Sequence, residues 1–174
     1  MNRSKRTALR LLGASLILLG LAFALLGLPA RGARLEESAF AFLSTDRPGI
    51  TAHNSPAVAV DASRPQSMAV ADKIDTPTIS CTVSVSGNGG GNWEGLDLPL
   101  PDPATQCFWP DLAFGDGGDL LVLYTDLRER YNQSRGVWLQ RFADGAPAGQ
   151  PTKVAGDHTF HARMAVDGQR VYVA

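Results

Sequence analysis

The chain has 174 residues, of which 44% are hydrophobic and 19% charged, and its formal net charge is -1. This balance gives no reason to expect a nucleic-acid partner or a strongly acidic one. The 18 glycines and 11 prolines favour many turns over long helices, so the composition predicts a turn-rich β fold of about one domain.

The first 30 residues have the pattern of an export segment. Four basic residues and no acid lie within residues 1–10, and residues 11–28 carry no charge. A helix of that length would extend about 27 Å, close to the thickness of a bilayer's hydrocarbon core. Residues 1–30 are therefore expected to be either a cleaved signal peptide or an uncleaved signal-anchor helix. The basic cluster predicts that the remaining chain lies on the extracytoplasmic side, anchored or secreted, with residues 31–52 as a tether.

Two cysteines, Cys81 and Cys107, have neither a metal-binding nor a CxxC spacing. In an exported domain they are expected to form a disulfide, and the alternative is a pair of buried thiols. No cofactor or metal is expected. His158 and His161 would point to opposite faces of a strand, which suits a shared metal badly.

An internal repeat runs through residues 53–174. One short phrase, mostly apolar and containing a shared alanine, opens three units about fifty residues apart: Pro56–Asp61, Pro110–Asp116 and Ala162–Asp167. Each phrase is followed by a second strand-like run after a polar turn. Such spacing is typical of β-propeller blades with four antiparallel strands. We therefore predict an all-β propeller with about two and a half blades. Because the third unit stops within its second strand, we expect an amino-terminal fragment of a longer product.

A glycine-rich loop after the third strand of the first unit carries Ser86, Asn88, Gly90 and Trp93 in the pattern Ser-x-Asn-x-Gly-x-Asn-Trp. The Ser and Asn side chains can bond to the loop backbone, the glycines accept positive φ, and the tryptophan can pack back onto the sheet. The pattern resembles the Asp box, Ser-x-Asp-x-Gly-x-Thr-Trp, with Asn replacing Asp and Thr. Residues 53–174 thus resemble the sialidase-like (BNR-repeat) β-propellers, in which the Asp box is structural.

The resemblance also implies where catalytic residues would lie. Sialidases bind a carboxylated sugar with three arginines and use a Tyr nucleophile, its Glu partner and an Asp acid/base. The acid/base position falls on Asp75, in the phrase Ile74-Asp75-Thr76-Pro77; the alternative is that Asp75 caps a turn before Pro77. Asn54 occupies the place of the first arginine and supplies no charge. The other catalytic residues would belong to later blades.

The repeat itself gives a second candidate site. Asp111 and Arg163 occupy the same repeat position as Ala57. Strand alternation places them opposite larger residues that suit packing between sheets, namely Val58, Leu112 and Met164, and Val60, Phe114 and Val166. If the opening strand of each unit lies nearest the propeller axis, the two charges face the central channel. There they either bind a polar ligand or form a salt bridge.

Three functions follow from these patterns. The favoured one is a membrane-tethered, extracytoplasmic sialidase-like propeller that binds glycans or protein partners, because Asn54 replaces an arginine. The alternatives are an exo-sialidase with Asp75 as acid/base, and a structural or sensory ectodomain. The expected contacts are a membrane and a carbohydrate ligand, with no nucleic acid; the oligomeric state stays open.

Overall fold

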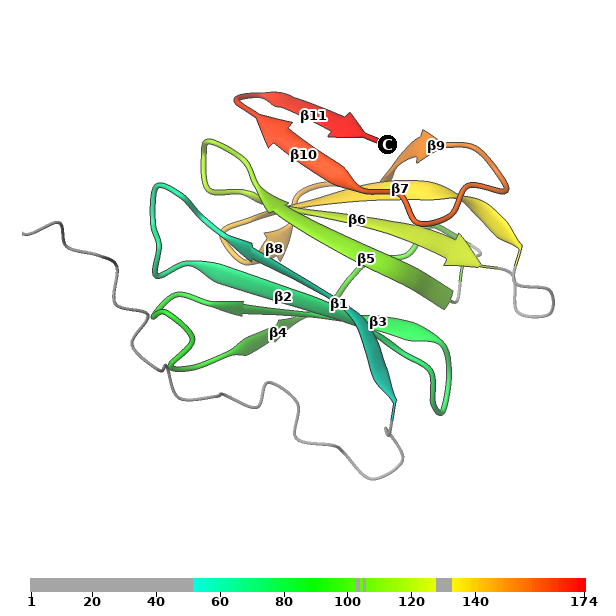
Figure 1. Cartoon of the computed structure of the whole chain (residues 1–174), viewed down its shortest axis with the longest axis horizontal. Coiled ribbons are helices and arrows are strands. Elements are labelled where there is room, and N and C mark those ends of the chain that lie inside the picture. The colour runs from blue at the N-terminus through cyan, green and yellow to red at the C-terminus, as the bar shows by residue number, and fades with distance from the viewer. Residues whose placement is uncertain (1–51, 103, 105, 128–132) are drawn as a thin grey trace, which may run out of the picture. The chain divides into compact units, whose positions relative to one another are not determined.

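The computed structural model describes residues 52–102, 104, 106–127 and 133–174, all within one compact unit, Ala41–Ala174 (Figure 1). In this part of the chain the regular elements are strands, and every pairing between them is antiparallel. The all-β class is confirmed for the described residues. They contain no helix long and apolar enough to cross a bilayer. The hydrophobic helix and the tether expected before residue 53 lie outside them.

The first sheet contains four strands in chain order: β1 (His53–Val60), β2 (Met68–Ile74), β3 (Ser80–Ser86) and β4 (Glu94–Leu96). The second sheet repeats this order with β5 (Gln106–Phe114), β6 (Leu120–Leu127), β7 (Ser134–Ala143) and β8 (Ala146–Pro147), and β9 (Thr152–Ala155) also pairs with β7. A third pair follows, β10 (Met164–Asp167) with β11 (Arg170–Val173). Each phrase of the sequence repeat thus lies on the opening strand of one sheet.

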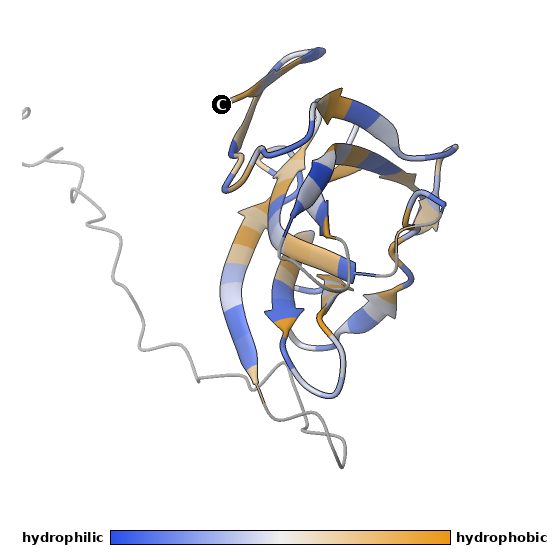
Figure 2. Ribbon diagram, turned by 90° about the vertical axis from the view of Figure 1, so that its right-hand side faces the viewer, coloured by the Kyte–Doolittle hydropathy of each residue, from blue (hydrophilic) through white to orange (hydrophobic). Residues whose placement is uncertain are grey.

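The first and second sheets pack through unequal side chains. Ala57, Ala71 and Val83 of the first sheet form one buried cluster with Leu112, Val122 and Tyr124 of the second. The small alanines allow the larger residues to approach closely, as dense interior packing requires. Figure 2 shows hydrophobic and hydrophilic residues alternating along the strands. Alternation therefore gives each strand a face that another sheet can cover.

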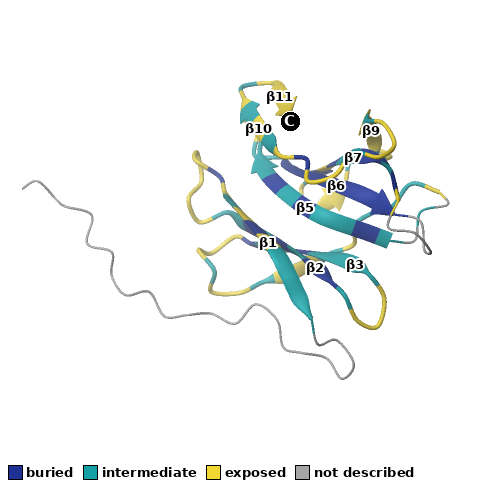
Figure 3. Cartoon of the chain, turned by 45° about the vertical axis from the view of Figure 1, so that its right-hand side comes forward, coloured by how far each residue is buried: buried dark blue, intermediate teal, exposed yellow. Residues whose placement is uncertain are grey.

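The other face of the second sheet receives the third pair of strands. Leu123 and Val137 form a separate buried cluster with Ala162, and Met164 packs against it. Strand β6 is consequently buried at all eight positions, as its dark blue colour in Figure 3 shows. The second sheet is thus the central layer of the described residues.

Val58 and Val60 depart from the expectation that they pack between sheets. Their equivalents Leu112, Phe114 and Met164 do pack against a neighbouring layer. Val58 and Val60, however, are 62% and 48% exposed. The reason is that β1 covers the second sheet with its alanine face, and no described strand covers its valine face.

The repeat extends to the backbone just before each phrase. The pairing register of β1 shifts between Asn54 and Ala57, and that of β5 shifts between Phe108 and Asp111. Within these irregular stretches Ser55 and Trp109 have φ of 52° and 45°, and His161 before the third phrase has 55°. Such left-handed conformations are uncommon for residues other than glycine. The first two units thus share a bulged opening, and all three share a left-handed residue just before the phrase.

Candidate functional site

The three left-handed residues line a single cavity. It has a volume of about 250 Å³ and is lined by Ser55, Trp109, Pro110, His161, Ala162 and Arg163. These residues come from the openings of three consecutive units, which lie side by side only because the layers are stacked. We call it the strand-start cavity. Bulges re-aim side chains, and strained residues cluster at binding sites, so the location is a candidate for ligand contact.

Trp109 and His161 line the strand-start cavity and belong to a larger cluster of aromatic rings. The ring of Trp109 meets those of His161, Phe108 and Phe160 edge to face, with centroids 3.5, 4.1 and 5.7 Å apart. Phe160 is 39% exposed, so part of this cluster faces solvent. Edge-to-face contacts hold rings in defined positions. A ligand would meet a pre-formed apolar surface here.

Of the two residues predicted to bind a ligand, Arg163 lines the strand-start cavity, whereas Asp111 does not line it but pairs with Arg163. Arg163 Nη1 lies 3.4 Å from Asp111 Oδ1, while Asp111 Oδ2 accepts a hydrogen bond of 2.7 Å from the backbone N–H of Met164. The Arg163 side chain is 73% exposed and that of Asp111 only 15%. Asp111 therefore attaches β10 to β5 and also neutralises a cation at the cavity.

Asp75 lies in a polar group close to the same strand openings. Asn54 Nδ2 donates a hydrogen bond to Asp75 Oδ2, and Lys73 Nζ lies 2.5 Å from Asp75 Oδ1. Ser55 Oγ in turn donates to Asn54 Oδ1 at 3.2 Å, which connects this group to the strand-start cavity. The Lys73 side chain is 9% exposed, and its ammonium group lies 4.1 Å from the centre of the Phe108 ring.

These contacts govern the acidity of Asp75. The hydrogen bond from Lys73 lowers the pKa of Asp75 below its ordinary value, and a partial opposing effect comes from burial. The attraction of the Lys73 charge and the hydrogen bond from Asn54 lower this pKa further. A general acid requires a raised pKa at neutral pH. In this arrangement Asp75 is a hydrogen-bond acceptor rather than a proton donor.

The glycine-rich loop has the internal contacts of a closed hairpin. Ser86 Oγ accepts from the N–H of Gly90 at 2.9 Å, and Asn88 Oδ1 accepts from the N–H of Asn92 at 2.8 Å. Trp93 Nε1 donates to the carbonyl of Gly90 at 3.0 Å. Gly90 has φ of 90°, which residues with a side chain rarely adopt. Asn88 thus supplies a side-chain acceptor to the backbone of its own loop.

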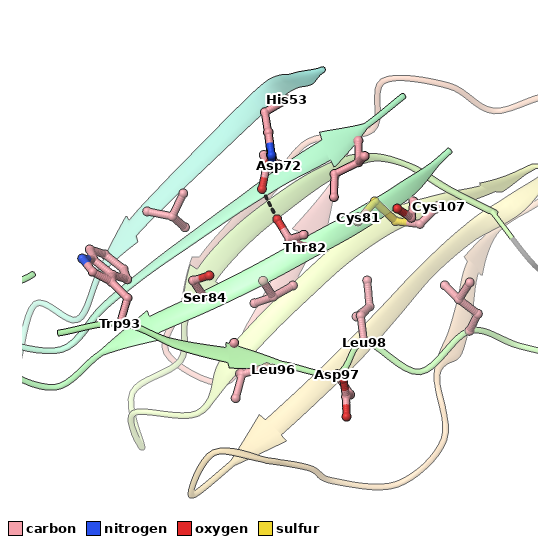
Figure 4. A pocket seen from close by; sticks show the side chains of 16 residues that line it. His53, Asp72, Cys81, Thr82, Ser84, Trp93, Leu96, Asp97, Leu98 and Cys107 are labelled. Atoms are coloured by element: carbon pink, nitrogen blue, oxygen red, sulfur yellow. Dashed lines mark hydrogen bonds and ion pairs between the residues drawn. A yellow bond between two sulfur atoms is a disulfide. The ribbon is translucent and has the colours of Figure 1, made fainter. Parts of the chain in front are cut away.

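A larger cavity of about 900 Å³ lies along the first sheet (Figure 4). Three of its side chains are linked in a row. His53 Nδ1 lies beside Asp72 Oδ2, and Thr82 Oγ1 donates a hydrogen bond to Asp72 Oδ1. Nucleophilic catalysis needs the hydroxyl bonded to the imidazole, so that the base can take its proton. Here the hydroxyl bonds to the carboxylate instead. This cluster is therefore built as a polar cross-strand link.

The disulfide partners named from the sequence are joined in the structure. Cys81 of β3 and Cys107 of β5 have Cα atoms 5.4 Å apart, within the range that a disulfide allows. Figure 4 shows the bond at the end of the larger cavity. Cys107 is 1% exposed, so the bond links the two sheets within their shared core.

A buried carboxylate on β6 lies apart from the lining of both cavities. Asp126 on β6 is fully buried, and its nearest ion-pair partner among the described residues is Arg135, with 3.8 Å between Arg135 Nε and Asp126 Oδ2. Burial raises the pKa of the neighbouring Tyr124, and the charge of Asp126 adds to that rise. Tyr124 is therefore a neutral hydroxyl, which donates to the Pro99 carbonyl at 2.7 Å.

Sequence reasoning missed three residues of this region: Trp109, His161 and Lys73. The first two precede the repeated phrase by one position, as Ser55 does, so the repeat held a signal for them. The sequence held no signal for Lys73, because its contact with Phe108 joins strands of two different sheets. Among the described residues, no group of three or more His, Cys, Asp or Glu is placed to hold a metal ion.

Comparison with known proteins gives no assignment. No family model, no curated protein and no solved structure matches this chain. The function must therefore be argued from the site itself.

Proposed function

We propose that this chain is a membrane-tethered, extracytoplasmic propeller of the sialidase-like type, and that it binds a glycan at the strand-start cavity. The observation that carries the proposal is the convergence of Ser55, Trp109 and His161, equivalent residues of three consecutive units, on one cavity. A site built from successive units around a common point is what a propeller offers to a ligand. The charge pattern of residues 1–30 supports the membrane location.

The packing of the units supports the propeller type. Leu112 and Met164, which share one repeat position, each pack against the layer that precedes them in the chain. The second sheet thus packs on the first through the same repeat position by which the third pair of strands packs on the second sheet. The Asp-box-like contacts of Ser86, Asn88 and Trp93 further favour the sialidase-like family.

Binding is favoured over hydrolysis by the contacts of Asp75. Its carboxylate is paired with Lys73 and bonded by Asn54, and its pKa is lowered. An exo-sialidase would need this group to give a proton to the leaving oxygen. One observation favours the alternative, an exo-sialidase with Asp75 as acid/base. The Asp75 side chain is 39% exposed, so a substrate could reach it from solvent.

The test uses the full chain purified in detergent and applied to an immobilised panel of neutral and sialylated glycans. We expect saturable binding that falls about tenfold or more in Trp109→Ala, a change worth about 1.4 kcal/mol or more. Tyr172→Ala is the matched control, because this aromatic residue is 52% exposed and does not line the cavity. Absence of binding to every glycan, or equal loss in both variants, would contradict the proposal.

A parallel assay with a fluorogenic sialoside separates binding from catalysis. We expect no release above the background set by Asp75→Ala. Release that depends on Asp75 would establish the enzyme instead.

A further inference from the structure

The geometry points to an uncharged sugar ring, rather than a carboxylated one, as the ligand of the strand-start cavity. This inference rests on the proposed function and specifies its ligand class. It is carried by the charges around the cavity and by the positions of the aromatic rings.

Each cation described at this end of the sheets already has a carboxylate partner. Arg163 lies 3.4 Å from Asp111, and Lys73 lies 2.5 Å from Asp75. A ligand carboxylate would compete with Asp111 for the guanidinium and bring a like charge close to it. Like charges at such distances disfavour binding, whereas a neutral ligand meets no such penalty.

Arg163, already paired with Asp111, suits a hydroxyl group better than a carboxylate. A hydroxyl both donates and accepts hydrogen bonds, while a carboxylate only accepts them and a guanidinium only donates them. A sugar hydroxyl can therefore accept a hydrogen bond from Arg163, which lines the cavity, without displacing Asp111 from the pair. Asp111 is held in place beside Arg163 by the N–H of Met164 at 2.7 Å.

The aromatic residues supply the apolar half of the site. A sugar ring has C–H faces that pack on aromatic rings, and Trp109 and His161 both line the cavity with their centroids 3.5 Å apart. Both residues have left-handed backbones, and Trp109 lies in the bulged opening of β5. Such pre-organisation reduces the conformational entropy that the protein loses when a ligand binds. The volume of about 250 Å³ suits one ring better than an extended chain.

The experiment measures calorimetric binding of the full chain to N-acetyllactosamine and to the same sugar capped with sialic acid. We expect the neutral sugar to bind about tenfold tighter or more, because each tenfold step needs only about 1.4 kcal/mol. In Asp111→Asn the freed Arg163 should raise the affinity for the sialylated sugar and remove this preference. Asp119→Asn is the matched control, since Asp119 pairs with Arg141 at 2.7 Å and lines neither cavity.

The outcomes separate the two levels of the proposal. Equal or tighter binding of the sialylated sugar by the unaltered chain would overturn the inference and leave glycan binding intact. An Asp111→Asn variant that keeps the neutral preference would overturn the charge argument behind it. Binding of no glycan from the larger panel would remove the proposed function itself.

Discussion

Asp111 and Arg163 stand at the same position of consecutive repeat units, and their side chains meet at 3.4 Å. Asp111 also accepts the backbone N–H of Met164, so one carboxylate joins β5 to β10 by two contacts. The pair thus links two layers, and Arg163 also lines the strand-start cavity.

Removal of this link should loosen the third pair of strands. Asp111→Ala leaves the Met164 N–H without its acceptor, and the loss of such a bond costs about 1–3 kcal/mol. We expect faster amide hydrogen exchange at Met164 and along β10, with little change in β2 and β3. Asp119→Ala serves as the control. Unchanged exchange at Met164 would show that Asp111 does not hold β10.

The equivalent positions Val58 and Leu112 should respond very differently to truncation. Leu112 is 7% exposed and lies in the core between the sheets, so Leu112→Ala should cost about 2–5 kcal/mol of unfolding free energy. Val58 is 62% exposed, so Val58→Ala should change stability by only about 0.5 kcal/mol. Urea denaturation of the full chain measures both. Similar losses in the two variants would mean that the valine face of β1 is covered.

The disulfide should contribute substantially to stability. Cys81 and Cys107 are 26 residues apart. Closing a loop of that length lowers the conformational entropy of the unfolded chain, which stabilises the folded state by about 3–4 kcal/mol. We expect the double variant Cys81→Ser with Cys107→Ser to unfold at correspondingly lower urea concentration. The single variant Cys81→Ser should be no more stable than the double one. An unchanged midpoint in the double variant would contradict the expectation.

The glycine-rich loop should tolerate an acid and reject an apolar residue at its centre. Asn88→Asp keeps the oxygen that accepts from the Asn92 N–H, whereas Asn88→Ala removes it. We expect a loss of about 1 kcal/mol for the alanine variant and a smaller change for the aspartate variant. Thermal unfolding, followed by tryptophan fluorescence, ranks the two. An alanine variant as stable as the aspartate variant would show that the side-chain bond is unimportant.

Asp61 should give the fold a dependence on acid pH. Hydrogen bonds from Ser63 and Arg64 lower the pKa of Asp61 from 3.8 to about 2, and Arg64 also donates to the Gly118 carbonyl of the second sheet. A pKa that is lower in the folded state stabilises the fold above the unfolded value near 3.8. This contribution is then lost as the pH falls through about 2.

The measurement compares the unfolding free energy of the wild type and Asp61→Asn between pH 6 and pH 2. We expect a difference that is constant above about pH 5 and shrinks progressively below it. Glu94→Gln, which alters an exposed carboxylate of β4, is the control. A difference that grows with acid would have the wrong sign for this mechanism.

The sequence alone determined the local elements of the described chain. Turn composition and the repeated phrase predicted strands, and β1, β5 and β10 carry the three phrases. The loop contacts of Ser86 and Trp93 also follow from residue type and spacing, because they join residues at most four apart. Short-range geometry needs little more than the residues themselves. The propeller type and the membrane segment stay predictions.

The tertiary structure decided which faces are covered and which residues meet. Alternation places Ala57 and Val58 on opposite faces, but only the position of the second sheet makes the alanine face the buried one. Trp109 and His161 are 52 positions apart and share a cavity because the layers stack. Their left-handed backbones depend on that packing as well, since strained conformations persist only where surrounding contacts hold them. Long-range contacts of this kind leave no local signal in the chain.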